Sequence, residues 1–246
     1  MLYHSRISFD MGLFSRKYSI LDKRLLEGAT DHHSHILFGV DDGVSKPEDS
    51  LTILSMLEEA GLRSLWLTPH TMEDVPNTTA GLKERFEELK AMYHGTVELH
   101  LASEYMMDEL FEKHLADKDF LFHREEGSVL METSTWSGPY NFWDMIDRTM
   151  RSGFRPVLAH PERYEYMGEK EYSRLRGMGV RFQMNYPSLL GYYGEHVKEK
   201  AAMILKKGWY DMAGSDCHRV RAIRHQLEDK VLKKDAAEAL RCILNV

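Results

Sequence analysis

The sequence predicts a protein of the α/β class, built as a barrel of seven parallel strands with helices between them. Two observations support this prediction. Short apolar runs alternate with amphipathic helical segments, and most of the runs end in, or lead to, a His, Asp or Glu. Successive runs lie roughly 25–35 residues apart, about the length of one strand, its helix and the connecting loops. The chain has 246 residues, enough for one large domain of this kind.

The predicted strands are apolar runs rich in β-forming residues. They end at Asp31–His33, Trp66–Thr68, His100–Ala102, Leu130–Glu132, Leu158–His160, Met184–Asn185 and Ala213–Asp216.

The predicted helices lie between most of these strands. The first begins near Ser45, because Ser45 and Glu48 match a capping box and Pro47 occupies the first turn, and it stops at Gly61. Further apolar stripes at helical spacing cover 82–93, 142–150, 197–205 and 222–244. A break in the last stripe is expected near Asp235. We interpret each stripe as a packing face.

The positions of the polar residues decide between an open sheet and a barrel. In an open parallel sheet, ligands gather at the switch point between two strands. In a barrel, the carboxyl ends of all strands face one shared mouth. Because six of the seven predicted strands end in or lead to a His, Asp or Glu, the barrel is favoured.

Composition indicates a globular protein with a sizeable core, since 43% of the residues are hydrophobic. The net charge of −7 argues against non-specific nucleic-acid binding as a main task. The two cysteines, Cys217 and Cys242, form no CxxC pair, so a reducing compartment such as the cytoplasm is expected. No stretch approaches the roughly 20 apolar residues of a membrane span.

The chain is predicted to consist of an N-terminal leader, 1–28, and a single barrel domain, 29–246. The leader contains basic residues, among them Arg6, Arg16 and Lys17, but no apolar core that would indicate a secretion signal. A solvated tail is the favoured interpretation. The alternative is peripheral contact with the anionic inner face of a membrane.

The candidate metal ligands begin with His33 and His35, whose i, i+2 spacing places both side chains on one face of a strand. Asp216 and His218 repeat this spacing. The full set is His33, His35, Asp42, His70, Glu104, Glu132, His160, Asp216 and His218. One such residue alone is usually a hydrogen-bonded loop residue. Imidazoles and carboxylates gathered at strand ends, however, favour a multinuclear site for ions such as zinc, manganese or iron.

These motifs resemble the polymerase-and-histidinol-phosphatase (PHP) superfamily, and within it the bacterial tyrosine-protein phosphatases associated with capsular and exopolysaccharide biosynthesis. The resemblance covers about residues 29–244. The run Asp41–Gly43 and the run His160–Tyr164 narrow it to this branch. It implies a distorted seven-stranded (β/α)7 barrel similar to a TIM barrel, known as the PHP fold.

The resemblance also implies three metal ions, with manganese expected first and iron, zinc or magnesium as alternatives. One ion is implied to be held by His33, His35, Glu104 and Asp216, a second by Glu104, Glu132 and His160, and a third by Asp42, His70 and His218. Clustered metal ions of this kind generate hydroxide from bound water at neutral pH. We therefore expect a metal-bound hydroxide to attack phosphorus directly, without a phosphoenzyme.

Candidate phosphate-binding arginines follow two of the ligand motifs. Arg163 lies three residues past His160, and its guanidinium has the fork that matches phosphate oxygens. A second arginine is implied just after His218, with Arg221 as the first candidate and Arg219 as the second. Arg163 and Arg221 are the predicted catalytic residues, and all three arginines are predicted to bind substrate.

A cysteine-based mechanism is rejected on spacing. Phosphatases that use a cysteine thiolate need a C-x5-R loop, and counting from Cys217 the arginine position holds Ile223. Cys242 lies too close to the end of the chain for such a loop.

The predicted function is hydrolysis of phosphotyrosine in proteins, with the tail of a membrane tyrosine kinase of polysaccharide export as the implied partner. A small-molecule phosphomonoesterase of the histidinol-phosphatase type is the second hypothesis. A nuclease role is weakened by the net charge. A metal-binding regulator without turnover is the remaining alternative. Self-association is left open.

Overall fold

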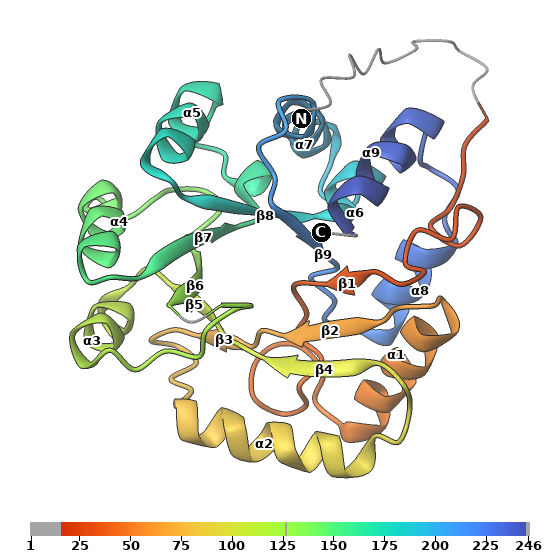
Figure 1. Cartoon of the computed structure of the whole chain (residues 1–246), viewed down its shortest axis with the longest axis horizontal. Coiled ribbons are helices and arrows are strands. Elements are labelled where there is room, and N and C mark those ends of the chain that lie inside the picture. The colour runs from red at the N-terminus through yellow and green to blue at the C-terminus, as the bar shows by residue number, and fades with distance from the viewer. Residues whose placement is uncertain (1–15, 126, 245–246) are drawn as a thin grey trace.

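The chain folds into two parallel sheets surrounded by helices (Figure 1). The computed structural model describes residues 16–125 and 127–244. Its strands there are β1 (Thr30–Asp31), β2 (Ser64–Leu67), β3 (His70–Thr71), β4 (Glu98–Leu101), β5 (Glu104–Met106), β6 (Ser128–Glu132), β7 (Arg155–Ala159), β8 (Arg181–Asn185) and β9 (Met212–Gly214). Its helices are α1 (Pro47–Glu59), α2 (Thr79–Met92), α3 (Glu109–Asp117), α4 (Phe142–Arg151), the 3-10 turn η1 (Pro161–Arg163), α5 (Glu169–Met178), α6 (Tyr186–Leu190), α7 (Glu195–Lys206), α8 (Val220–Glu228) and α9 (Lys234–Leu244).

The two sheets interleave along the chain, because β3 of the larger sheet precedes β4 of the smaller one, and they curl toward each other (Figure 1). The smaller sheet has the order β1-β2-β4 and the larger β3-β5-β6-β7-β8-β9, with every pair parallel. Only two residues separate β2 from β3, and two separate β4 from β5. At the β9 end of the larger sheet, a backbone hydrogen bond reaches the smaller sheet, because His32, directly after β1, donates to Ala213 of β9. The carboxyl ends of the strands therefore face a common region.

The predicted α/β class with parallel strands is confirmed. The predicted runs around residues 66 and 100 each continue after a short break into a further strand, β3 and β5. The closed seven-stranded barrel stays a prediction.

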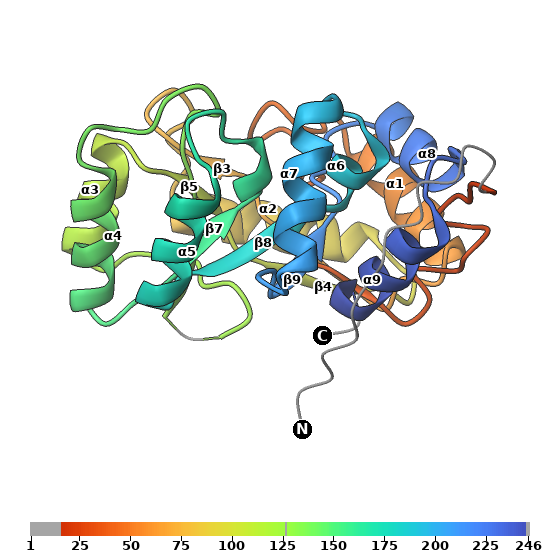
Figure 2. The same cartoon turned by 90° about the horizontal axis from the view of Figure 1, so that it is seen from above.

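The predicted helices are present, with corrections at their ends. The capping box at Ser45 is wrong, because Lys46 is the N-cap of α1 and no side chain caps it. Pro47 explains this, since the residue before a proline is held in an extended conformation. The break in the last helical stripe precedes Asp235, which lies in the first turn of α9. In Figure 2, α3 and α4 lie at one end of the molecule and α1, α8 and α9 at the other.

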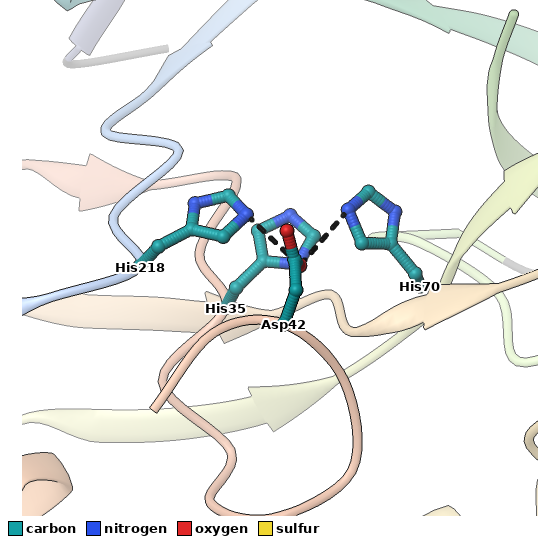
Figure 3. Close-up of side chains that lie close together, drawn as sticks. All are labelled: His35, Asp42, His70 and His218. Carbon is teal, nitrogen blue, oxygen red and sulfur yellow. Dashed lines mark ion pairs between the residues drawn. The ribbon is translucent and has the colours of Figure 1, made fainter. Parts of the chain in front are cut away.

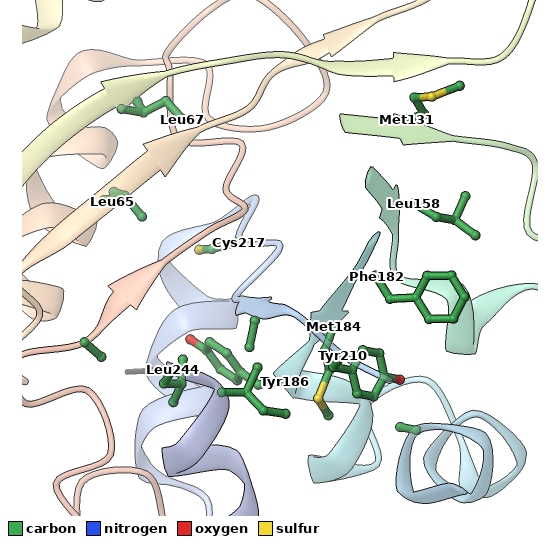
Figure 4. Packing of buried hydrophobic residues seen from close by; sticks show 14 of the residues in the cluster. Leu65, Leu67, Met131, Leu158, Phe182, Met184, Tyr186, Tyr210, Cys217 and Leu244 are labelled. Atoms are coloured by element: carbon green, nitrogen blue, oxygen red, sulfur yellow. The ribbon is translucent and has the colours of Figure 1, made fainter. Parts of the chain in front are cut away.

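The larger sheet separates two apolar regions. Leu158 of β7 is in register with Phe182 of β8 and belongs to the main core, which packs against the helices (Figure 4). Val157 and Ala159, whose side chains alternate with that of Leu158, belong to a small cluster on the other face. Leu130 also belongs to this small cluster and is in register with Glu104. The sheet therefore turns Glu104 away from the helices and toward its inner face.

Part of the predicted leader packs onto the rest of the chain. Tyr18 and Leu232 exchange two backbone hydrogen bonds of 2.9 and 3.0 Å. Ile20, Leu25 and Leu26 are buried. Residues 1–15 of the leader lie outside the described residues. Among the helices of the described ranges, none is long and apolar enough to cross a membrane.

Gly214 gives a test of how closely β9 approaches the chain after β1. A Cβ atom on Gly214 would lie 2.5 Å from both the backbone nitrogen and the Cβ of His33. We expect Gly214→Ala to destabilise the fold by about 1–3 kcal/mol, as overpacked interiors do. The measurement is the melting temperature by circular dichroism.

Gly177 in α5 is the matched control, since a Cβ atom added there would have no neighbour within 4 Å. Gly177→Ala should leave stability unchanged or raise it by about 0.5–1 kcal/mol. Equal melting temperatures for the two variants would contradict the close approach.

Candidate metal centre

The structure brings all nine predicted ligand residues into one cluster at the carboxyl ends of the strands. In each neighbouring pair a ring nitrogen lies no more than 3.6 Å from a carboxylate oxygen, and the pairs connect all nine residues. The pairs are His33–Glu104, His33–Asp216, His35–Glu104, His35–Asp216, His70–Asp42, His70–Glu104, His70–Glu132, His160–Glu104, His160–Glu132, His218–Asp42 and His218–Asp216. Their roles as ligands remain a prediction, but their convergence is observed.

Three subsets of the cluster have ligand atoms within 4.8 Å of one another. They are His33, His35 and Glu104; His70, Glu104 and Glu132; and His35, Asp42, His70 and His218. Figure 3 shows the last subset, in which Asp42 lies between two of the imidazoles. Compared with the predicted grouping, Glu104 is again shared between two subsets, and His35 and His70 are shared as well.

The orientation of three imidazoles is set by acceptors outside the subsets. Nδ1 of His33 donates to Oε1 of Gln183 at 2.8 Å. Nδ1 of His218 donates to the backbone carbonyl of Asp216 at 2.9 Å. Nδ1 of His35 donates to Oδ2 of Asp41 at 2.8 Å. With Nδ1 held in this way, Nε2 of each ring is directed toward the cluster and is the nitrogen that a bound metal ion would use.

Asp41 orients His35 and also holds two backbone segments of the site. Its carboxylate also accepts the backbone N–H of His70 at 3.0 Å and that of Gly43 at 3.0 Å. Gly43 in turn must lack a side chain, since a Cβ there would meet the carbonyl oxygen of His35. One buried carboxylate therefore fixes two histidines from different parts of the chain.

Three polar atoms at the centre of the cluster have no hydrogen-bond partner among the described residues. Oε2 of Glu104 lies 3.2–3.3 Å from ring nitrogens of His33, His35 and His70, yet it is buried and forms no hydrogen bond. Oε1 of Glu132 and Nδ1 of His70 are 2.9 Å apart and also unbonded. Buried polar atoms are rarely left unpaired. Converging lone pairs of nitrogen and oxygen fit divalent cations of the zinc, manganese or iron kind.

The carboxylates of the cluster favour positive charge on the groups around them. Burial alone lowers the pKa of His33, but the carboxylates of Glu104 and Asp216 outweigh burial and raise this pKa to about 9. The pKa of His70 rises to about 10 in the same way, chiefly through Glu132 and Glu104 acting against burial. Protons thus supply the positive charge that bound cations would supply in their place.

Two of the ligand candidates have strained backbones. His160 has φ of 32° and Asp216 has φ of 50°, both in the left-handed region. Such a conformation in a residue other than glycine costs about 1–3 kcal/mol and is found most often at functional sites. Here it turns each side chain into the cluster at the point where β7 or β9 ends.

The predicted phosphate-binding arginines separate into two neighbouring cavities. Arg163 lines a cavity of about 510 Å³ together with much of the cluster, and its Nη1 donates to Oδ2 of Asp216 at 2.8 Å. Arg219 and Arg221 line an adjoining cavity of about 450 Å³. Both are exposed on or beside α8. The two cavities share Tyr193, Asp216 and His218.

Cys217 lies among these residues but faces the main apolar core. It is fully buried, and burial raises the pKa of its thiol to about 12. A thiol in this state is a poor nucleophile, which agrees with rejecting a cysteine mechanism on spacing.

Sequence reasoning missed Gln183 and Tyr193. Gln183 orients His33 and also accepts the backbone N–H of His160 at 3.3 Å. Its position inside β8 offered a signal, because a polar residue in an apolar strand points to a buried partner. Tyr193 lies in a loop, where the sequence offers no comparable signal.

The fold and the site together define an α/β protein in which side chains that could bind metal ions gather at the ends of parallel strands. Residues 29–241 match the family described as capsular polysaccharide synthesis, CpsB/CapC, and the chain belongs to this family.

Characterised relatives and a solved structure resemble the chain over most of its length. The tyrosine-protein phosphatase YwqE of Bacillus subtilis is 26% identical over 218 residues, covering 85% of this chain and 86% of YwqE. The tyrosine-protein phosphatase CpsB of Streptococcus pneumoniae is 27% identical over 223 residues, covering 85% and 91%. A crystal structure from work on YwqE and CpsB, described there as unique metal-dependent tyrosine phosphatases, matches with a TM-score of 0.75 at 22% identity. It covers 88% of each chain, and this likeness shows the fold.

Metal binding to the cluster should stabilise the protein. We expect Mn²⁺ at a hundred times its Kd to add about 2.7 kcal/mol to the free energy of unfolding of chelator-treated protein. His33→Ala should bind fewer metal ions per chain and gain less stability. Metal content by mass spectrometry and melting temperature check both.

The control is His196→Ala, since His196 is an exposed residue of α7. It should keep the metal content of the unaltered protein. Equal metal content in the His33 and His196 variants would contradict the ligand assignment.

Proposed function

We propose that the protein is a metal-dependent phosphotyrosine-protein phosphatase. One observation carries the proposal: a buried cluster of imidazoles and carboxylates opens into a cavity that also contains Arg163. Metal ligands and a guanidinium in one cavity suit a phosphate ester, whose charge needs several positive groups around it. The names of the relatives, tyrosine-protein phosphatases, support the substrate class.

We infer that three ions, with manganese preferred, occupy the cluster. The proposed ligand sets are His33, His35, Glu104 and Asp216; Glu104, Glu132 and His160; and Asp42, His70 and His218. The unpaired buried oxygen of Glu104 between three imidazole nitrogens supports a shared position for this residue. When bound, such ions lower the pKa of water and offset charge on phosphoryl oxygens.

The side chains of this protein have separate tasks in the proposed reaction. Arg163 binds the phosphoryl oxygens, because its guanidinium faces the same cavity as the ligands. Water rather than Cys217 is the nucleophile, since the thiol is buried and protonated. With water as the nucleophile, the proposed reaction proceeds without a phosphoenzyme. Arg219 and Arg221 contact parts of the substrate that extend into the adjoining cavity.

The proposed substrate is a phosphotyrosine segment of a protein, specifically the tail of a membrane tyrosine kinase that acts in polysaccharide export. The name of the family, capsular polysaccharide synthesis, supports this partner. The protein would then work in the cytoplasm, at or near the inner face of the membrane. We further propose that residues 29–246 form one seven-stranded barrel domain and that 1–28 form a leader, held through Tyr18.

A comparison of two substrates tests the proposed function. With Mn²⁺ present, a phosphotyrosine peptide should be hydrolysed with a higher kcat/KM than histidinol phosphate, and a chelator should abolish both activities. Phosphate release measured side by side checks this. A preference for histidinol phosphate would favour the small-molecule phosphomonoesterase, and no turnover of either substrate would favour a regulator.

Substitution of single arginines tests the proposed phosphate contact. We expect Arg163→Ala to lower kcat/KM about 10²–10³-fold, as loss of one preorganised donor does. Arg221→Ala should have a smaller effect, because Arg221 is exposed and lines the adjoining cavity. Arg224→Ala is the control, since Arg224 is exposed and lines neither cavity.

Steady-state kinetics with p-nitrophenyl phosphate and with a phosphotyrosine peptide measure these effects. An Arg163→Ala variant as active as Arg224→Ala would rule out the assigned role.

A further inference from the structure

The loop between α6 and α7 presents two tyrosines beside the metal centre. Gly191 and Gly194 flank this pair with φ of 87° and 91°, a left-handed conformation that favours glycine. Tyr192 anchors the loop, since its hydroxyl donates to Oδ2 of Asp229 at 2.8 Å. Tyr193 lines both cavities of the site, whereas Tyr192 lines only the adjoining one.

The ring of Tyr193 lies against the guanidinium of Arg163. The central carbon of the guanidinium is 4.5 Å from the centre of the ring, within the range of a cation–π contact. The hydroxyl of Tyr193 donates a long hydrogen bond of 3.5 Å to Oδ2 of Asp216, and it makes no hydrogen bond to Arg163 in the described residues. The face of the ring is therefore the main contact that Tyr193 offers to Arg163.

Asp216 is the other contact of Arg163, and its two oxygens face different partners. Oδ1 lies 3.4–3.6 Å from ring nitrogens of His33, His35 and His218. Oδ2 accepts from Arg163 at 2.8 Å and from Asn185 at 2.6 Å. A cation at Oδ1 would draw negative charge from the carboxylate and weaken its hold on the guanidinium. The contact with the Tyr193 ring does not depend on that charge.

We propose that Tyr193 is a positioning residue that holds Arg163 in the orientation that receives a phosphoryl group, and that it acts through its ring and not its hydroxyl. This inference rests on the proposed phosphatase function. A long arginine side chain loses rotamer entropy when it is fixed, so a preorganised guanidinium binds phosphate more tightly than a free one.

Substitutions at position 193 separate the ring from the hydroxyl. In the Mn²⁺-loaded protein, Tyr193→Leu should lower kcat/KM for p-nitrophenyl phosphate about 3- to 30-fold, the range of a cation–π contact. Tyr193→Phe keeps the ring and should stay within about twofold of the unaltered protein. Tyr140→Leu is the matched control, since Tyr140 is fully exposed and lines neither of these two cavities. If Tyr193→Leu does not fold, Tyr193→Met serves instead, because methionine also lacks an aromatic ring but has a longer side chain than leucine.

A double-mutant cycle tests whether Tyr193 acts through Arg163. The variant Arg163→Ala with Tyr193→Leu should be no less active than Arg163→Ala alone, because the ring then has no guanidinium to hold. Additive losses would overturn the proposal. So would a Tyr193→Phe variant as impaired as Tyr193→Leu.

Binding of inorganic phosphate to the same Mn²⁺-loaded proteins gives a readout that needs no turnover. Calorimetry should show a Kd about 3- to 30-fold higher for Tyr193→Leu than for Tyr193→Phe. Equal Kd values, or no binding of phosphate by the unaltered protein, would overturn the proposal. If the unaltered protein binds phosphate but hydrolyses no phosphate ester, the proposed function fails, whereas the Kd comparison still decides the role of Tyr193.

Discussion

The buried carboxylate of Glu104 is the constraint on which the rest of the site depends. It sits among the ring nitrogens of His33, His35 and His70, with one oxygen unpaired and no exposed surface. A charged group in such a place is stable only beside compensating positive charge. Protonated imidazoles supply that charge in the absence of cations, and cations supply it better because they also use the lone pairs. The strands around Glu104 can therefore be understood as a frame for bound metal.

The frame is rigid because a second layer of hydrogen bonds fixes the first. Asp41 holds His35, and Gln183 holds His33. Glu162, which is fully buried, accepts from the backbone of Asn185 and from the hydroxyls of Ser188 and Tyr210. These contacts join β8, α6 and the turn after β7. Such outer contacts set both the direction and the basicity of metal ligands, so the affinity of the site is distributed over many elements.

The sequence was sufficient to predict the α/β class and the convergence of the nine predicted ligand residues, because each is a His, Asp or Glu at the end of an apolar run. It was less informative about features that depend on three-dimensional geometry rather than on residue type. The N-cap of α1 is Lys46 rather than Ser45, because a proline follows Lys46. Two predicted strands are each interrupted, into β2 and β3 and into β4 and β5, where the chain passes from one sheet to the other. Tyr193 gave no signal, because its contact with Arg163 arises only when two distant loops fold together.

Asp216 connects the two halves of the proposed chemistry. One of its oxygens faces the imidazoles, the other faces Arg163, and its backbone is strained into the left-handed region. Relaxing that backbone would move both oxygens at once, so the cluster of predicted ligands and Arg163 cannot shift independently. The strain is tolerated because Asn185 and His218 hold the residue from either side, through its carboxylate and its carbonyl. In the proposed reaction, binding of cations and binding of a phosphate ester would for this reason be coupled through a single side chain.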